Sequence, residues 1–159
     1  MSRTVNVLIV GIGGQGVLKA SQVLSEALVR QGFDVKQSEV HGMAQRGGSV
    51  VSEVRFGDEV FSPVTGQTEA DYVVVLEENE GKRSAPRLRR GAGRMVEVPP
   101  ETVDALPDPR SRNMAALGRL SAFLDIQEPV WFGAIAACMP AASVEANVQA
   151  FKAGRALEP

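Results

Sequence analysis

The sequence predicts a single α/β domain over residues 1–159, built on a doubly wound, mixed and mainly parallel sheet. Three observations favour this fold class. Residues 5–10 (VNVLIV) form a β-branched, almost continuous apolar run, which is typical of a parallel strand buried on both faces. A glycine-rich turn follows this run at once, and a helical pattern of apolar residues follows the turn. Residues 71–76 (DYVVVL) are a second strongly apolar run, which predicts another central parallel strand.

The segments after the glycine turn predict a helix, two strands and a hairpin. Gly32 stands where a glycine commonly ends a helix. Residues 33–40 and 49–56 have strand patterns, and the second of them alternates apolar and polar positions. A tight-turn signal at Gly57 and Asp58 precedes residues 59–61, which predicts an exposed β-hairpin there. The stripe that defines the helix consists of Val17, Ala20, Val23, Leu24, Ala27 and Leu28.

The second half of the chain predicts short elements followed by C-terminal helices. Residues 77–94 are polar and favour a short helix, and residues 95–98 favour a short strand. Residues 99–109 are spaced by prolines, which indicates a surface linker. We expect three helices beyond it, over about 113–124, 130–137 and 143–157, with Ser143 as the N-cap of the last.

Composition argues against several classes of protein. The chain has 17 basic and 19 acidic residues and a net charge of −2, which argues against a nucleic-acid or anionic-membrane partner. Cys138 is the single cysteine, so no internal disulfide and no cysteine-held iron–sulfur cluster can form within this chain, and a reducing cytoplasm is the expected compartment. The run 5–10 is too short for a membrane span or a signal-peptide core, so we expect neither a membrane segment nor a targeting segment.

The first glycine-rich turn, GIGGQG, matches the G-x-G-x-x-G fingerprint of Rossmann-like dinucleotide sites. The glycines of that fingerprint let backbone N–H groups and a helix N-terminus approach a phosphate. The fingerprint also requires an acidic residue about twenty positions later for a ribose, and Glu39 is the nearest candidate. Residues 41–48 are too few for a crossover helix, so the second and third strands should be antiparallel, which argues against NAD or FAD. The candidate ligand-binding residues of this turn are Gly11, Gly13, Gly14, Gln15 and Gly16.

A second glycine-rich stretch, HGMAQRGG, should lie close to the first. If the first two strands are parallel, their carboxyl ends lie at the same edge of the sheet and both stretches emerge there. Two such loops predict close approach by a phosphate-bearing ligand or another polypeptide, while the alternative is that the glycines only permit sharp turns. His41 is either a proton carrier or a hydrogen-bonded structural residue, and the guanidinium of Arg46 suits a phosphate or a carboxylate. The candidate residues here are His41, Gly42, Gln45, Arg46, Gly47 and Gly48.

Four stretches together resemble the gamma-type domain of the 2-oxoacid:ferredoxin oxidoreductases. They are GIGGQGVLKASQVLSEAL, SEVHGMAQRGGSVVSEVRFG, ADYVVVLE and NMAALGRLSAFL, and the resemblance extends from residue 5 to about residue 157. The form with HGMAQRGGSV is most similar to the beta subunits of the indolepyruvate-oxidising branch of that family. The stretch between ADYVVVLE and NMAALG is shorter than is usual in the family, which puts the far edge of the sheet and the choice of substrate in question.

The resemblance implies a place in a multi-subunit enzyme. Such enzymes decarboxylate a 2-oxoacid on thiamine diphosphate, pass electrons through iron–sulfur clusters to ferredoxin, and transfer the acyl group to coenzyme A. The resemblance also implies that a large partner subunit holds the thiamine diphosphate and the clusters. This chain would complete the assembly and help bind coenzyme A or cover the thiamine site. We therefore assign no catalytic or metal-binding residue to the chain and expect it to be inactive alone. A stand-alone nucleotide-binding module and a structural partner without a ligand are the alternatives, and self-association of the isolated chain stays open.

Overall fold

A five-stranded sheet forms the centre of the protein, whose computed structural model describes residues 3–41 and 48–158. The strand order is β2-β3-β1-β4-β5. Among these strands only β3 runs against the others, because it pairs antiparallel with both neighbours, so the prediction of a mixed, mainly parallel sheet is confirmed. The strands are β1 (Val5–Ile12), β2 (Asp34–His41), β3 (Ser49–Gly57), β4 (Tyr72–Val75) and β5 (Arg94–Val96).

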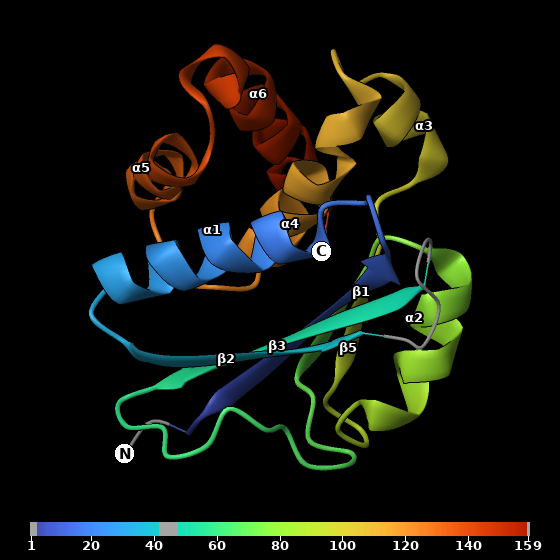
Figure 1. Cartoon of the computed structure of the whole chain (residues 1–159), viewed down its shortest axis with the longest axis vertical. Helices are drawn as coiled ribbons and strands as arrows, with labels where there is room; N and C mark the ends of the chain where they lie inside the picture. The colour runs from blue at the N-terminus through green and yellow to red at the C-terminus, as the bar shows by residue number, and fades with distance from the viewer. Residues whose placement is uncertain (1–2, 42–47, 159) are drawn as a thin grey trace.

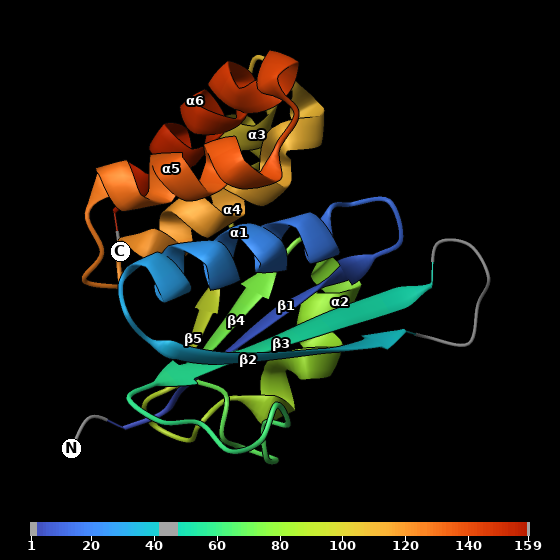
Figure 2. The ribbon, with the colours of Figure 1, turned by 60° about the vertical axis from the view of Figure 1, so that its left-hand side comes forward.

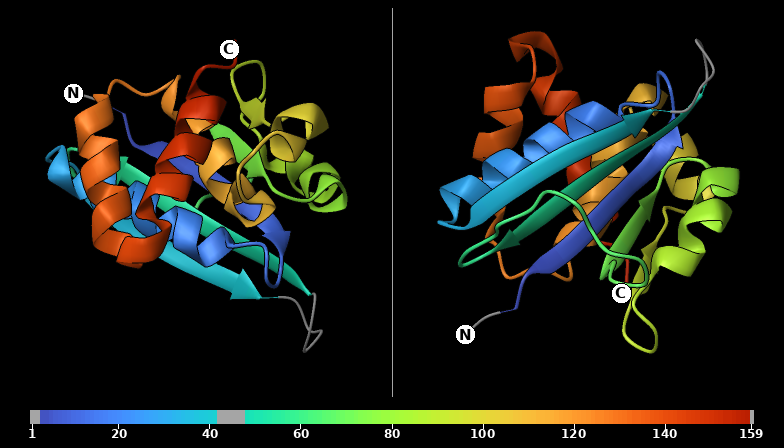
Figure 3. Two further views of the ribbon diagram at one scale, coloured as in Figure 1. Left: turned by 90° about the horizontal axis from the view of Figure 1, so that it is seen from above. Right: turned by 60° about the horizontal axis from the view of Figure 1, so that its bottom comes forward.

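Helices cover both faces of the sheet, as a doubly wound domain requires. Figures 1 and 2 show α1, α4, α5 and α6 over one face and α2 over the other. In the right-hand view of Figure 3, in which the bottom of the molecule is turned forward, α2 lies over one side of that second face, and the chain between β3 and β4 crosses the other side. The helices are α1 (Val17–Arg30), α2 (Glu78–Ser84), α3 (Pro100–Asp104), α4 (Arg112–Ser121), α5 (Glu128–Cys138) and α6 (Val144–Arg155).

Alternation along β1 divides the core into two clusters. Side chains of a strand point to opposite faces in turn. Val7 and Ile9 pack in the larger cluster beneath α1, and Leu8 and Val10 pack in the smaller one on the face of α2. All four are fully buried, which explains why residues 7–10 include no polar side chain.

Two glycines allow α4 and α6 to pack with their backbones in contact. A Cβ built on Gly118 of α4 would overlap the carbonyl oxygen of Phe151, and one built on Gly154 of α6 would overlap that of Ala115. The close approach fixes α6 above the sheet next to α4, the helix that reaches down to the first glycine turn.

The exposed hairpin predicted at Gly57 was wrong. Gly57 is buried at the end of β3, where a Cβ would lie 3.3 Å from the backbone of Thr4. The N–H of Val60 donates to Asp34 at the start of β2 over 2.8 Å, so the chain is tied to the sheet edge instead of forming a further strand. The antiparallel hairpin pair of this fold is β2 and β3.

Two local predictions in the second half also need correction. Residues 99–109 are not only a linker, because Pro100 begins α3 at a position where proline is favoured and a 3₁₀ turn, Pro109–Ser111, follows. Ser143 occupies the N-cap position of α6, but its hydroxyl donates to the carbonyl of Pro140 over 2.9 Å and does not cap the helix. The shortened middle segment still supplies an edge strand, the three-residue β5.

Candidate functional site

The first glycine turn connects β1 to α1 in a backbone form that favours glycine. Gly14 and Gly16 have φ angles of +87° and +83°, in the left-handed region where a Cβ is disfavoured. Gly16 is also the N-cap of α1. The side chain of Asn113 from α4 donates to its carbonyl over 3.2 Å, and a Cβ on Gly16 would overlap that side chain. The turn is therefore shaped by its own geometry and by the close approach of α4.

Gln15 closes this turn from inside. Its side-chain oxygen accepts the N–H of Ile12 over 2.9 Å. A Cβ on Gly11 would lie 2.8 Å from that oxygen and 3.2 Å from the Cβ of Leu76, the residue that follows β4. The glycine is needed at this position because the glutamine side chain and the neighbouring strand fill the space.

The two glycine-rich stretches meet at one edge of the sheet. β1 and β2 run in the same direction with β3 between them, so their carboxyl ends lie at that edge, which confirms the expected placement. The N–H of Gly13 donates to the carbonyl of Gly48 over 3.0 Å and joins the first stretch to the second. The candidate residues Gly42, Gln45, Arg46 and Gly47 lie outside the described residues.

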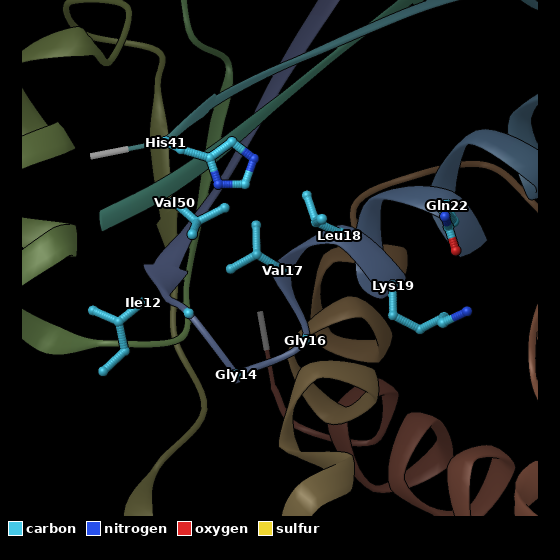
Figure 4. Close-up of a pocket in the computed structure, with 10 residues that line it drawn as sticks. Ile12, Gly14, Gly16, Val17, Leu18, Lys19, Gln22, His41 and Val50 are labelled. Atoms are coloured by element: carbon cyan, nitrogen blue, oxygen red, sulfur yellow. The ribbon is translucent and has the colours of Figure 1, made fainter. Parts of the chain in front are cut away.

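A cavity of about 460 Å³ opens beside this junction. That volume lies within the range of sites for small molecules and cofactors. Figure 4 shows side chains of the first turn of α1 facing His41 of β2 and Val50 of β3 across the cavity. Its walls are glycine backbone and apolar side chains, with Lys19 and His41 as the titratable groups among the lining residues, which are Ile12, Gly13, Gly14, Gly16, Val17, Leu18, Lys19, Gln22, His41 and Val50.

Glu39 does not serve the role that the dinucleotide fingerprint requires. β3 separates its strand from β1, whereas the fingerprint places the acidic residue on the strand next to the glycine turn. Glu39 does not line the cavity, and its carboxylate lies 3.8 Å from Nε2 of His41. Both side chains are more than a third exposed, so this contact is a weak, solvated one. The arrangement gives no support to an NAD site.

Lys19 is a candidate that the sequence interpretation missed. It is the third residue of α1, its Nζ donates to the carbonyl of Cys138 over 3.1 Å, and it lines the cavity. The sequence contains a signal for this residue. A cation in the first turn of a helix is opposed by the helix dipole, and the first turn of α1 has no acidic residue to offset it. Lys19 also borders a second cavity of about 310 Å³ that Arg110 lines. Hydrogen bonds from Arg110 lower the pKa of the Asp108 carboxyl there, so that side chain is anionic at neutral pH.

The donor set does not fit an iron–sulfur cluster. Such clusters are held by several thiolates, and this sequence has one cysteine. Burial raises the pKa of the Cys138 thiol, which keeps it protonated at neutral pH. Over residues 3–41 and 48–158, no group of three or more His, Cys, Asp or Glu side chains is placed to hold a metal ion. No helix in the same ranges is both long and apolar enough to cross a membrane.

The chain matches a known family over almost all its length. The profile of the family described as "Pyruvate ferredoxin/flavodoxin oxidoreductase" matches residues 6–157. Indolepyruvate oxidoreductase subunit IorB of Pyrococcus horikoshii is 42% identical over 86 residues, which cover 54% of this chain and 43% of the relative. The match thus spans less than half of that relative. 2-Oxoglutarate synthase subunit KorC of Archaeoglobus fulgidus is 31% identical over 169 residues, covering 97% of this chain and 88% of the relative.

Solved structures share the fold at low sequence identity. The gamma subunit of a keto/oxoacid ferredoxin oxidoreductase from Geobacter sulfurreducens aligns with a TM-score of 0.77 and 22% identity, over 94% of this chain and 95% of that one. The 2-oxoglutarate:ferredoxin oxidoreductase of Magnetococcus marinus, solved with 2-oxoglutarate, coenzyme A and succinyl-CoA bound, aligns with a TM-score of 0.80 and 19% identity. That alignment covers 98% of this chain and 31% of the longer one. Both likenesses confirm the fold predicted from the sequence.

Proposed function

The chain belongs to the pyruvate ferredoxin/flavodoxin oxidoreductase family, and we propose that it is the small subunit of a 2-oxoacid:ferredoxin oxidoreductase complex. In this proposal a large partner subunit holds the thiamine diphosphate and the iron–sulfur clusters, because the single cysteine of this chain cannot hold a cluster. The complex oxidatively decarboxylates the 2-oxoacid to an acyl-CoA and passes the electrons to ferredoxin. We place it in the cytoplasm, because a single cysteine is typical of chains in a reducing compartment.

The observation that supports a ligand-binding role best is the junction of the two glycine-rich stretches beside the cavity. The Gly13–Gly48 hydrogen bond joins the first stretch to the end of the second, and Gly13 and His41 both line a space of about 460 Å³. The first-turn N–H groups of a helix have no partner within the helix, and the first turn of α1, which includes Lys19, lines this space. Such a wall attracts a phosphate-bearing molecule, and coenzyme A is the phosphate-bearing substrate of this reaction class. The coenzyme A bound in the Magnetococcus marinus enzyme agrees with this choice.

The chain's own groups would bind and shield this substrate. Backbone N–H groups and Lys19 hold the anionic part, and the apolar wall formed by Val17, Leu18 and Val50 excludes water from the rest. No described residue of the cavity forms a nucleophile–base pair, so we assign the chain no step of bond making. The sheet edge at which the two glycine-rich stretches meet, here called the glycine edge, would then cover the reacting centre of the partner.

We propose an aryl-pyruvate, and indolepyruvate in particular, as the 2-oxoacid. The support is the 42% identity to the IorB subunit, compared with 31% to the KorC subunit named for 2-oxoglutarate. The IorB match covers 54% of this chain. The experiment below therefore compares the two 2-oxoacids directly.

Reconstitution with the large subunit from the same genome tests the proposal. We expect a purified complex that contains thiamine diphosphate and iron and reduces ferredoxin with indolepyruvate and coenzyme A, faster than with 2-oxoglutarate. The isolated chain should be colourless and should turn over neither 2-oxoacid. An isolated chain that binds NAD tightly and associates with no large subunit would refute the proposal, and a preference for 2-oxoglutarate would refute the substrate alone.

A further inference from the structure

A buried carboxylate lies at the same edge of the sheet as the two glycine-rich stretches. Glu80 of α2 is only 5% exposed. Its Oε2 accepts the hydroxyl of Ser49 over 2.7 Å, and its Oε1 lies 3.3 Å from a guanidinium nitrogen of Arg83. A carboxylate is costly to bury and requires partners of this kind.

Glu80 is diverted from the role that its position in the helix predicts. Glu77 is the N-cap of α2 and accepts the N–H of Glu80 over 2.9 Å, so Glu80 is the third helical residue. In a capping box the side chain of that residue returns to the N-cap N–H. Here it reaches Ser49 instead, 31 positions away along the chain. The side chain therefore makes a tertiary contact in place of a local one.

Ser49 connects this carboxylate to the junction of the glycine-rich stretches. It is the first residue of β3 and is paired with Ile12 at the end of β1. The residue before it is Gly48, whose carbonyl accepts the N–H of Gly13. The contacts form one continuous path from Glu80 through Ser49 and Gly48 to Gly13. Displacement of Ser49 would carry the Gly48 carbonyl away from its donor.

We propose that Glu80 is a positioning residue, which holds the start of β3 through Ser49 and so keeps Gly48 against Gly13 at the rim of the cavity. Its consequence for coenzyme A rests on the proposed function, but the contact itself does not. The guanidinium of Arg83 beside Oε1 and the hydroxyl of Ser49 on Oε2 give both oxygens of this buried side chain a partner. The Glu80→Gln variant keeps an acceptor for the Ser49 hydroxyl and should therefore keep most of the positioning effect that Glu80→Ala loses.

Amide hydrogen exchange of Gly13 in the isolated full chain tests the contact directly. We expect the Gly13 amide to exchange about tenfold faster in Glu80→Ala, the ratio that loss of one ordinary hydrogen bond produces. Ser49→Ala should have the same effect, the double variant should be no faster than either single one, and Glu80→Gln should stay within about threefold of the wild type. Glu78→Ala is the matched control, because it removes the same charge from the same helix at a side chain that is 78% exposed.

The reconstituted complex then shows what the contact does. We expect the KM for coenzyme A to rise about fivefold to tenfold in Glu80→Ala and Ser49→Ala, with kcat within about twofold. Unchanged Gly13 exchange in Ser49→Ala, which removes one hydroxyl and tests the contact even if Glu80→Ala does not fold, would overturn the proposal. Faster exchange in a chain whose wild type forms no complex would support the positioning role and refute the proposed function instead.

Discussion

Replacing Gly14 by alanine should separate the role of the glycine turn from its contribution to stability. The φ of Gly14 is +87°, and nothing lies within 4 Å of a Cβ built on it. The substitution therefore costs backbone strain without a clash, about 1–2 kcal/mol. For a chain of this length that corresponds to a melting temperature lower by roughly 2–8 °C. Gly91 is the matched control, since its φ is +74° and its Cβ would also meet nothing within 4 Å.

Both variants should lose similar stability, but only one should affect the complex. Gly14 lines the cavity and Gly91 does not. We expect Gly14→Ala to raise the KM for coenzyme A about tenfold in the reconstituted complex, because a Cβ at the rim obstructs an approaching phosphate, and Gly91→Ala to leave it unchanged. Thermal unfolding of the isolated chains and steady-state titration of the complexes provide the two measurements. Equal effects of Gly14→Ala and Gly91→Ala on the KM would refute the reasoning.

Three further predictions concern the helix pair of α4 and α6, Lys19, and Arg46. Gly154→Ala should lower the stability by about 3 kcal/mol in thermal or urea unfolding, because its Cβ would overlap the backbone oxygen of Ala115 and the two helices must separate; a loss below about 1 kcal/mol would contradict the close packing. Lys19→Met should raise the KM for coenzyme A about tenfold and change the free energy of unfolding by less than about 1 kcal/mol. The control Lys82→Met on α2 should leave both quantities unchanged, and equal KM values for the two variants would count against a phosphate contact. Arg46→Lys keeps the charge but loses the planar fork, so turnover of the complex should fall at unchanged stability, and a lower melting temperature at full activity would instead mark the arginine as structural.

The sequence by itself determined the elements whose signals are local. The apolar run of β1, the stripe of α1 and the left-handed glycine after it depend on residues a few positions apart, and the structure places them as predicted. The antiparallel pairing of β2 and β3 also followed from local information, because a segment of eight residues cannot hold a crossover helix. The prediction of an exposed hairpin at Gly57 was also based on a local signal. It was wrong because tertiary contacts with Thr4 and Asp34 overrode that signal.

Only the tertiary structure decided which side chains surround the glycine edge. Asn113 reaches Gly16 across 97 positions and Glu80 reaches Ser49 across 31, and neither pair shares a spacing or a periodic pattern in the sequence. Gly118 and Gly154 likewise appear in the sequence as weak points of two helices, and only the packing of α4 on α6 shows that they permit the contact. Propensity and periodicity act over a few residues, whereas these contacts depend on how separate elements are brought together when the core is buried.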